Sequence, residues 1–109
     1  MASAAAQARL LSLTMYRSDL QFKLMNISVS RQALTTQAMQ IAQAYSDAGI
    51  EEGYEDDLEV IKINKAEQRL EQQQQMVQTE LTEINAEYDS IEKLVGENIK
   101  RDFKLNFGS

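Results

Sequence analysis

The sequence predicts an all-α protein: a long antiparallel helical hairpin, coiled-coil-like, that assembles with other copies. The 109 residues contain no proline and only four glycines, a composition typical of long helices. Apolar residues recur at steps of three and four through two stretches of similar length, which is the pattern of helices with one packed face. A short acidic segment separates the two stretches. This length leaves room for a single helical-hairpin domain over residues 1–109.

The first helix is expected over about residues 2–47, because nothing in that range forces a break. Its packed stripe contains two polar interruptions, Arg17 and Arg31, which would fix the register or mark the arrival of a third helix. Residues 26–30 are the weakest helical stretch and allow a kink, since Ser and β-branched residues are poorer helix formers. The apolar members of the stripe are Leu10, Leu13, Leu20, Leu24, Ile27, Leu34, Ala38, Ile41 and Tyr45.

An acidic turn is expected over residues 48–57. Gly49 suits the C-cap of the first helix, and Asp56 or Asp57 suits the N-cap of the second. The carboxylates of this segment lack the spacing of a calcium loop. They are therefore interpreted as a solvated turn.

The second helix is expected over about residues 58–103, followed by an apolar tail over 104–109. Its stripe contains one inserted step of four, which predicts a stutter in the supercoil, and a polar position at Gln73. Glutamines 68, 72–75 and 78 form a band that is either a polar contact between subunits or a solvent-exposed face. The stripe residues are Ile63, Ala66, Leu70, Gln73, Val77, Leu81, Ile84, Tyr88, Ile91, Val95, Ile99 and Phe103.

A second apolar stripe on the first helix is the most informative feature of the chain. At about 100° per residue, Phe22 lies roughly 200° around the helix from Leu20. One partner helix within the chain covers the first stripe and leaves the second uncovered, so we expect other copies to cover it. The last residues are also apolar, and they suit either docking on a partner or capping of the first helix. The predicted inter-subunit interface is Leu11, Met15, Phe22, Met25, Val29, Phe103, Leu105 and Phe107.

Charge is distributed unevenly along the chain. Residues 1–50 carry four basic and two acidic residues, whereas residues 51–109 carry seven basic and fifteen acidic residues. The basic residues of the first helix would pair with the acidic second helix, either of a neighbouring copy or of the same chain. An acidic chain without a basic face is a poor ligand for nucleic acid.

Several function classes are excluded by missing residue types. The chain contains no cysteine, histidine or tryptophan, so disulfides, thiolate or imidazole metal sites and His-based catalysis are absent. We expect no enzyme activity, no catalytic residues, no cofactor and no metal. The sequence contains no run of about eighteen apolar residues, so we expect no membrane span. No cleavable signal peptide is evident, and secreted, cell-surface and cytoplasmic locations all remain open.

The chain is a short predicted hairpin without Cys, His or Pro, and it has an Ala/Ser/Gln-rich start and an apolar end. In these features it resembles the axial subunits of type III secretion and flagellar systems. That resemblance implies polymerisation by burial of both terminal helices in a tube wall. Where needle subunits have a Pro-containing turn, residues 47–50 here read Asp-Ala-Gly-Ile. The chain also resembles the WXG-type hairpins secreted by ESX systems. Residues 52–54, Glu-Gly-Tyr, lie at the turn, and Tyr88 and Glu92 fit a Tyr-x-x-x-Asp/Glu pattern.

These patterns together predict a structural self-assembling subunit of a helical filament, tube or comparable secreted or axial assembly. The alternative is a dimeric coiled-coil adaptor or secretion chaperone that binds a partner helix. The expected partners are other copies of the chain, and a secretion apparatus or a helical protein is the further candidate.

Overall fold

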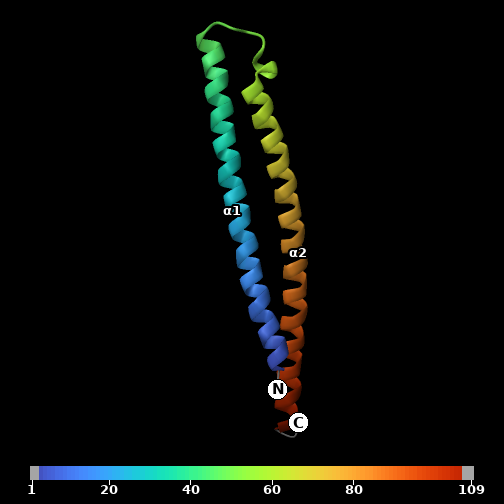
Figure 1. The fold of residues 1–109 in the computed structure, drawn as a ribbon. Helices are drawn as coiled ribbons and strands as arrows, with labels where there is room; N and C mark the ends of the chain where they lie inside the picture. The colour runs from blue at the N-terminus through green and yellow to red at the C-terminus, as the bar shows by residue number, and fades with distance from the viewer. Residues whose placement is uncertain (1–2, 107–109) are drawn as a thin grey trace. The chain divides into compact units, whose positions relative to one another are not determined.

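The computed structural model describes residues 3–106. Within that range the chain forms two long helices and one short one: α1 (Ala4–Asp47), the 3₁₀ helix η1 (Tyr54–Asp56) and α2 (Leu58–Asn106). Residues 3–106 contain no strand. The two long helices form a helical hairpin (Figure 1). The predicted all-α class and hairpin are therefore confirmed.

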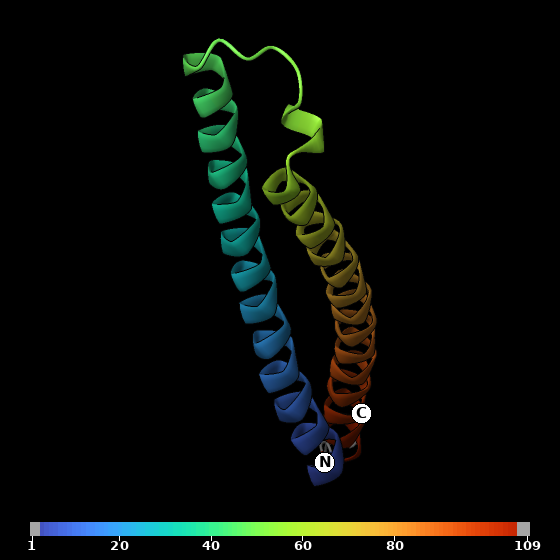
Figure 2. The ribbon, with the colours of Figure 1, turned by 45° about the horizontal axis from the view of Figure 1, so that its top comes forward.

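The chain divides into two compact units, each made of one segment of α1 and one of α2. The first unit contains the residues up to Phe22 and those from Gln78 onward, and the second is Lys23–Val77. In the second unit the turn and η1 connect the two helical segments (Figure 2). Each unit packs its own pair of segments, and the contacts described below lie within one unit or the other.

Both ends of α1 are capped by local hydrogen bonds. The Ser3 hydroxyl accepts a bond from the Ala6 N–H at 3.0 Å, so the helix begins directly after it. At the other end Gly49 has φ +70°, a conformation that costs glycine little. The N–H of Ile50 donates to the Tyr45 carbonyl and that of Gly49 to the Ser46 carbonyl, the bond pair of a Schellman motif. The expected C-cap at Gly49 is confirmed, and residues 26–30 are helical without a break.

Asp57 is the N-cap of α2, which resolves the choice between Asp56 and Asp57. Its carboxylate accepts a bond from the Glu59 N–H at 2.8 Å, as capping side chains do. The helix then continues through Asn106, so residues 104–106 are helical and do not belong to the tail that was expected to begin at 104. The reason is local: no glycine or proline lies between Leu58 and Asn106 except Gly96, which a long helix tolerates.

The packed face of α1 is the predicted stripe. Buried or half-buried residues follow unbroken steps of three and four from Leu10 to Tyr45 and include Arg17 and Arg31. The most buried of them are Leu13, Leu20 and Ile27. We call this face of α1, together with the facing residues of α2, the inner seam.

The inner seam of α2 differs from the expected stripe at four places, the first being Glu67 in place of its half-buried neighbour Ala66. Gln73 is exposed and Gln74 is half-buried, so the steps of three and four continue without a stutter. Ile99 and Phe103 were also expected in the seam, but they are 54% and 61% exposed. The α2 seam is Val60, Ile63, Glu67, Leu70, Gln74, Val77, Leu81, Ile84, Tyr88, Ile91, Val95, Asn98 and Asp102.

Polar partners explain why the sequence pattern was misleading there. Counting apolar residues favours positions such as Ala66, Ile99 and Phe103 over polar neighbours. The true seam includes Glu67 and Gln74, which are accommodated because both bond to Arg31. Unbroken steps of three and four are the repeat of a left-handed coiled coil.

Candidate assembly surface

The second apolar stripe of α1 lies outside the packing of the hairpin. We call Leu11, Met15, Phe22, Met25 and Val29 the outer stripe. Each is between 55% and 63% exposed. Exposed single apolar residues are ordinary on protein surfaces, but five of them on one helix at regular spacing form a continuous surface. The structure thus leaves this part of the predicted interface available, and its role in assembly stays a prediction.

The outer stripe has the spacing of a second coiled-coil seam. With Ser18 included, its members are separated by alternating steps of four and three. Residues at this spacing stay on one side of a helix and accept the side chains of a second helix. The repeat ends after Val29, because the next positions in the same register are Gln32, Thr36, Met39 and Gln43.

The surroundings of the outer stripe carry almost no charge. The neighbouring exposed positions are mostly hydroxyl or amide residues, and Asp19 and Lys23 are the charged exceptions. Depletion of charge is the compositional mark of the centre of a protein interface. The uncharged neighbours are Ser12, Thr14, Gln21, Asn26 and Ser28.

In the first unit, basic residues of α1 pair with α2 of the same chain. Arg9 bonds to the Glu87 carboxylate at 2.7 Å. The Arg17 guanidinium lies 4.6 Å from the centre of the Tyr88 ring and donates to the Asn85 amide oxygen at 3.5 Å. Pairing within the chain is the arrangement that the structure shows for these residues.

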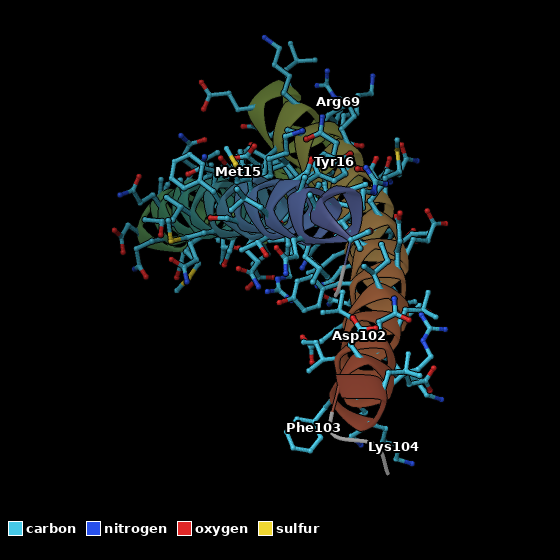
Figure 3. All side chains as sticks on the ribbon, turned by 90° about the horizontal axis from the view of Figure 1, so that it is seen from below. Met15, Tyr16, Arg69, Asp102, Phe103 and Lys104 are labelled. Carbon is cyan, nitrogen blue, oxygen red and sulfur yellow. The ribbon has the colours of Figure 1, made fainter. Side chains whose placement is uncertain are left out.

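Tyr16 adds one more cross-helix bond beside the outer stripe. Its hydroxyl donates to Glu80 at 2.9 Å, and this bond to a carboxylate raises the pKa of Tyr16 above its ordinary value. Figure 3 shows Tyr16 on the part of α1 nearer to α2, with its neighbour Met15 farther away. Adjacent residues of α1 therefore serve different surfaces.

In the second unit, Arg31 is the centre of a polar cluster in the inner seam. It donates to Glu67 at 3.0 Å and to the Gln74 amide oxygen at 2.5 Å. The glutamine band is thus divided, because Gln74 lies in the seam while Gln68, 72, 73, 75 and 78 are exposed. A buried polar group packs well only where its partners are present, so this cluster favours one register of the two helices.

The turn is attached to both helices by tyrosines. The Tyr54 hydroxyl donates to the Ala38 carbonyl at 3.2 Å, and the Tyr45 hydroxyl donates to Asp57 at 2.8 Å. The two rings lie edge to face with centroids 5.8 Å apart. The bond from Tyr45 lowers the pKa of Asp57, and the same bond raises the pKa of Tyr45. We call residues 47–59 the tip.

Open grooves lie next to the tip. One has a volume of about 620 Å³, with Ile41, Ala44 and Ile63 among its apolar lining and Asp57 and Glu59 among its polar lining. A second groove of about 300 Å³ includes Leu34, Ala38 and Met39. Small alanines contribute to both linings, which leaves this space beside the helices.

The last turns of α2 form a second exposed apolar region. Phe103 is 61% and Leu105 is 74% exposed. Figure 3 shows Phe103 and Lys104 at the end of α2, on turns that extend away from α1. Phe107, the last member of the predicted interface, lies outside the described residues.

Sequence reasoning missed other exposed apolar side chains. Leu94 is 56% exposed and lies two turns before Phe103, and Ile99 lies between them. Continuing the alternating steps of three and four along α2 from Leu70 and Val77 would have placed Leu94 and Ile99 outside the seam. Met39, Leu58 and Met76 are also exposed.

Two features are absent from the described residues, a membrane-spanning helix and a cluster of metal-binding side chains. Among residues 3–106, no helix is both long and apolar enough to cross a membrane. Over the same range, no three acidic side chains converge in a way that suits a metal ion.

The fold and surface define a helical hairpin with an uncovered coiled-coil seam. No protein-family model, curated protein or solved structure matches this chain. The arrangement of its own residues is therefore the basis for assigning a role.

Proposed function

We propose that this protein is a structural self-assembling subunit, and that its outer stripe packs against helices of other copies in a filament, tube or similar array. The observation that carries the proposal is the second heptad seam of α1, exposed over more than half of every side chain. The uncharged positions around it support a contact with protein over a contact with water.

The energetics of this surface are of the right order for association. Burying the exposed part of each side chain contributes roughly 1–2 kcal/mol, because full burial of such residues is worth about 1.5–3 kcal/mol. The five residues together therefore contribute about 5–10 kcal/mol. Association itself costs about 4–15 kcal/mol in lost freedom. One stripe is thus marginal, and a stable assembly needs further apolar surface from the partner or a second contact.

Placement in a secreted or axial assembly rests on the resemblance to type III secretion and flagellar subunits. A dimeric adaptor or secretion chaperone uses the same stripe differently, to hold the helix of another protein. The two functions differ in size behaviour: an open array grows with concentration, whereas a dimer reaches a fixed mass.

The test places a charge in the outer stripe and follows assembly. Phe22→Glu and Met25→Glu should abolish growth, because a carboxylate buried in an apolar contact is strongly unfavourable. Gln32→Glu is the matched control, since residue 32 continues the same register in a part of α1 without the stripe. Electron microscopy and light scattering over a concentration series measure the assemblies, and circular dichroism measures helicity.

We expect the wild-type protein and the Gln32→Glu variant to form growing assemblies, and the two stripe variants to remain small and helical. A wild-type dimer or tetramer whose mass does not change with concentration would support the adaptor function instead. Loss of helicity in the stripe variants would show that Phe22 and Met25 belong to the core of the hairpin.

A further inference from the structure

The tip is strongly acidic and carries exposed apolar side chains. Residues 47–59 contain seven carboxylates and no basic residue. Within the same segment Ile50 is 51% and Leu58 is 74% exposed. Tyr45 and backbone N–H groups occupy one of the carboxylates, that of Asp57.

The last turns of α2 have the opposite charge and a similar apolar content. Residues 98–106 contain three basic residues and one acidic residue, a net charge of +2. Lys100 and Arg101 are exposed. Between and beside them lie the exposed Ile99, Phe103 and Leu105.

We propose that copies also join end to end, with the last turns of α2 of one copy docked on the tip of the next. This inference rests on the proposed function and specifies a second contact. The occupant is a second copy because the two surfaces complement each other in charge and both present apolar groups. The end of α2 would bind in the groove of about 620 Å³ beside the tip.

The groove matches the chemistry of the α2 end. Apolar contact with Ile41, Ala44 and Ile63 suits Phe103, and the carboxylate of Glu59 in the same lining suits the neighbouring Lys100. Lys62 is the basic residue of that lining. Lys and Arg side chains are long and flexible, so those near Phe103 can extend to the carboxylates of the groove while the ring lies inside it.

Charge also determines which surfaces meet in this contact. A contact of tip against tip would place seven carboxylates against seven others. A head-to-tail contact instead joins unlike charges. A heterologous contact of this kind produces an open filament where the rotation between successive copies does not close, and a ring where it does.

The first test changes the charge of the α2 end. Lys100→Glu with Arg101→Glu should shorten the assemblies at least tenfold in mean length at low salt, and 1 M salt should restore part of that length by screening. The control pair Arg69→Glu with Lys93→Glu makes the same change in net charge at exposed positions of α2 outside the end. Electron microscopy gives the lengths, and sedimentation velocity gives the mass.

The second test detects the contact directly, and it is possible because the chain has no cysteine. Leu105→Cys and Ala44→Cys variants should form a mixed disulfide when combined under mild oxidation, and Lys100→Glu with Arg101→Glu in the first variant should suppress it. Ala33→Cys, at an exposed position of α1 that does not line the groove, replaces Ala44→Cys in the control.

The outcomes separate this inference from the proposed function. Assemblies of normal length in the Lys100→Glu/Arg101→Glu variant, or equal cross-linking to residues 33 and 44, overturn the end-to-end contact and leave the outer stripe untouched. Absence of any assembly by the wild-type protein overturns the proposed function. A mixed disulfide specific to residue 44 in the Phe22→Glu background supports the end-to-end contact independently of the stripe.

Discussion

The first part of α1, residues 4–29, and its remainder, residues 30–47, belong to one continuous helix but differ in what they leave exposed. The first part has apolar side chains on two faces, with Leu13 and Leu20 buried against α2 and the outer stripe in solvent. In the second part the corresponding outer positions are largely polar, and the turn is bonded back to Ala38. The second part therefore leaves few apolar side chains in solvent, whereas the first leaves the whole outer stripe exposed.

This difference separates formation of the hairpin from assembly. Substitutions on the inner seam should change the stability of a single chain, and substitutions on the outer stripe should change association. Substitutions that change the backbone of the turn should change the stability of a single chain, and substitutions of the exposed carboxylates of the tip should change the end-to-end contact. Each of these expectations can be measured on a matched pair of variants.

The largest expected effect distinguishes the two faces of the first part of α1. Leu20 is 0% exposed, and Leu20→Ala should destabilise the hairpin by about 2–5 kcal/mol through lost burial and a cavity. Leu11→Ala, on the outer stripe, should change the stability of the monomer by no more than about 0.5 kcal/mol. Urea unfolding followed by circular dichroism at low protein concentration measures both. Equal losses in the two variants would remove the distinction between the faces.

The next effect concerns the tip. Gly49 has φ +70°, so Gly49→Ala should cost about 1–2 kcal/mol, the penalty for placing an L-residue in the left-handed region. Gly96 lies within α2 with open space around a new Cβ, and Gly96→Ala should stabilise by about 0.5–1 kcal/mol. Thermal unfolding of the two variants should shift in opposite directions. A stabilised Gly49→Ala variant would show that the turn adopts another conformation in solution.

A smaller effect is expected at the polar cluster of the inner seam. Arg31→Ala should cost about 1 kcal/mol, because Glu67 and Gln74 lose a partner while remaining partly exposed. Replacing both Arg31 and Glu67 by Leu should recover or exceed wild-type stability. A double-mutant cycle measured by urea unfolding gives the coupling. Zero coupling would mean that the cluster has no part in holding the register.

The smallest effect is the dependence of the tip on pH. The folded state lowers the pKa of Asp57, so the stability from this carboxylate is present at neutral pH and is lost as the pH falls through its ordinary value to the lower folded value. The wild-type protein should therefore lose part of its advantage over Asp57→Ala as the pH falls below the ordinary aspartate pKa of 3.8. Thermal unfolding of both proteins across this range measures the difference.

The Tyr45 hydroxyl gives the opposite sign at high pH. Its pKa is raised in the folded state, so its contribution is complete below the ordinary tyrosine pKa and is lost as the pH rises through the folded value. Tyr45→Phe should lack that alkaline loss. A wild-type protein and a Tyr45→Phe variant with identical pH profiles would show that the bond to Asp57 does not contribute in solution.

The sequence predicted local features well and cross-helix pairing poorly. The α1 stripe and the Gly49 cap were correct because the steps of three and four and a glycine after a helix are local signals. The prediction that Gln73, and not Gln74, lies in the seam was wrong, and so was the placement of Ile99 there. The first error followed from choosing the apolar Ala66 over Glu67, which set the steps to Gln73, and the second from choosing the apolar Ile99 over Asn98. The sequence of α2 alone does not reveal that Arg31 bonds to Glu67 and Gln74.

The exposed surfaces divide in the same way. Periodicity alone placed the outer stripe opposite Leu20, since helix geometry assigns a face to every residue. It did not show that Phe103 extends on turns beyond the packing of α1, because that depends on how the two helices align.

What the sequence determined by itself is the existence of two long helices, their caps and the apolar surplus of α1, all of which depend on residues within a few turns of one another. Only the tertiary structure decided the register of α1 against α2 and the partners of Arg9, Arg17 and Arg31. It also decided the attachment of Tyr54 to Ala38. These features join residues far apart in the chain, and many registers satisfy the same apolar repeat until specific polar pairs favour one of them.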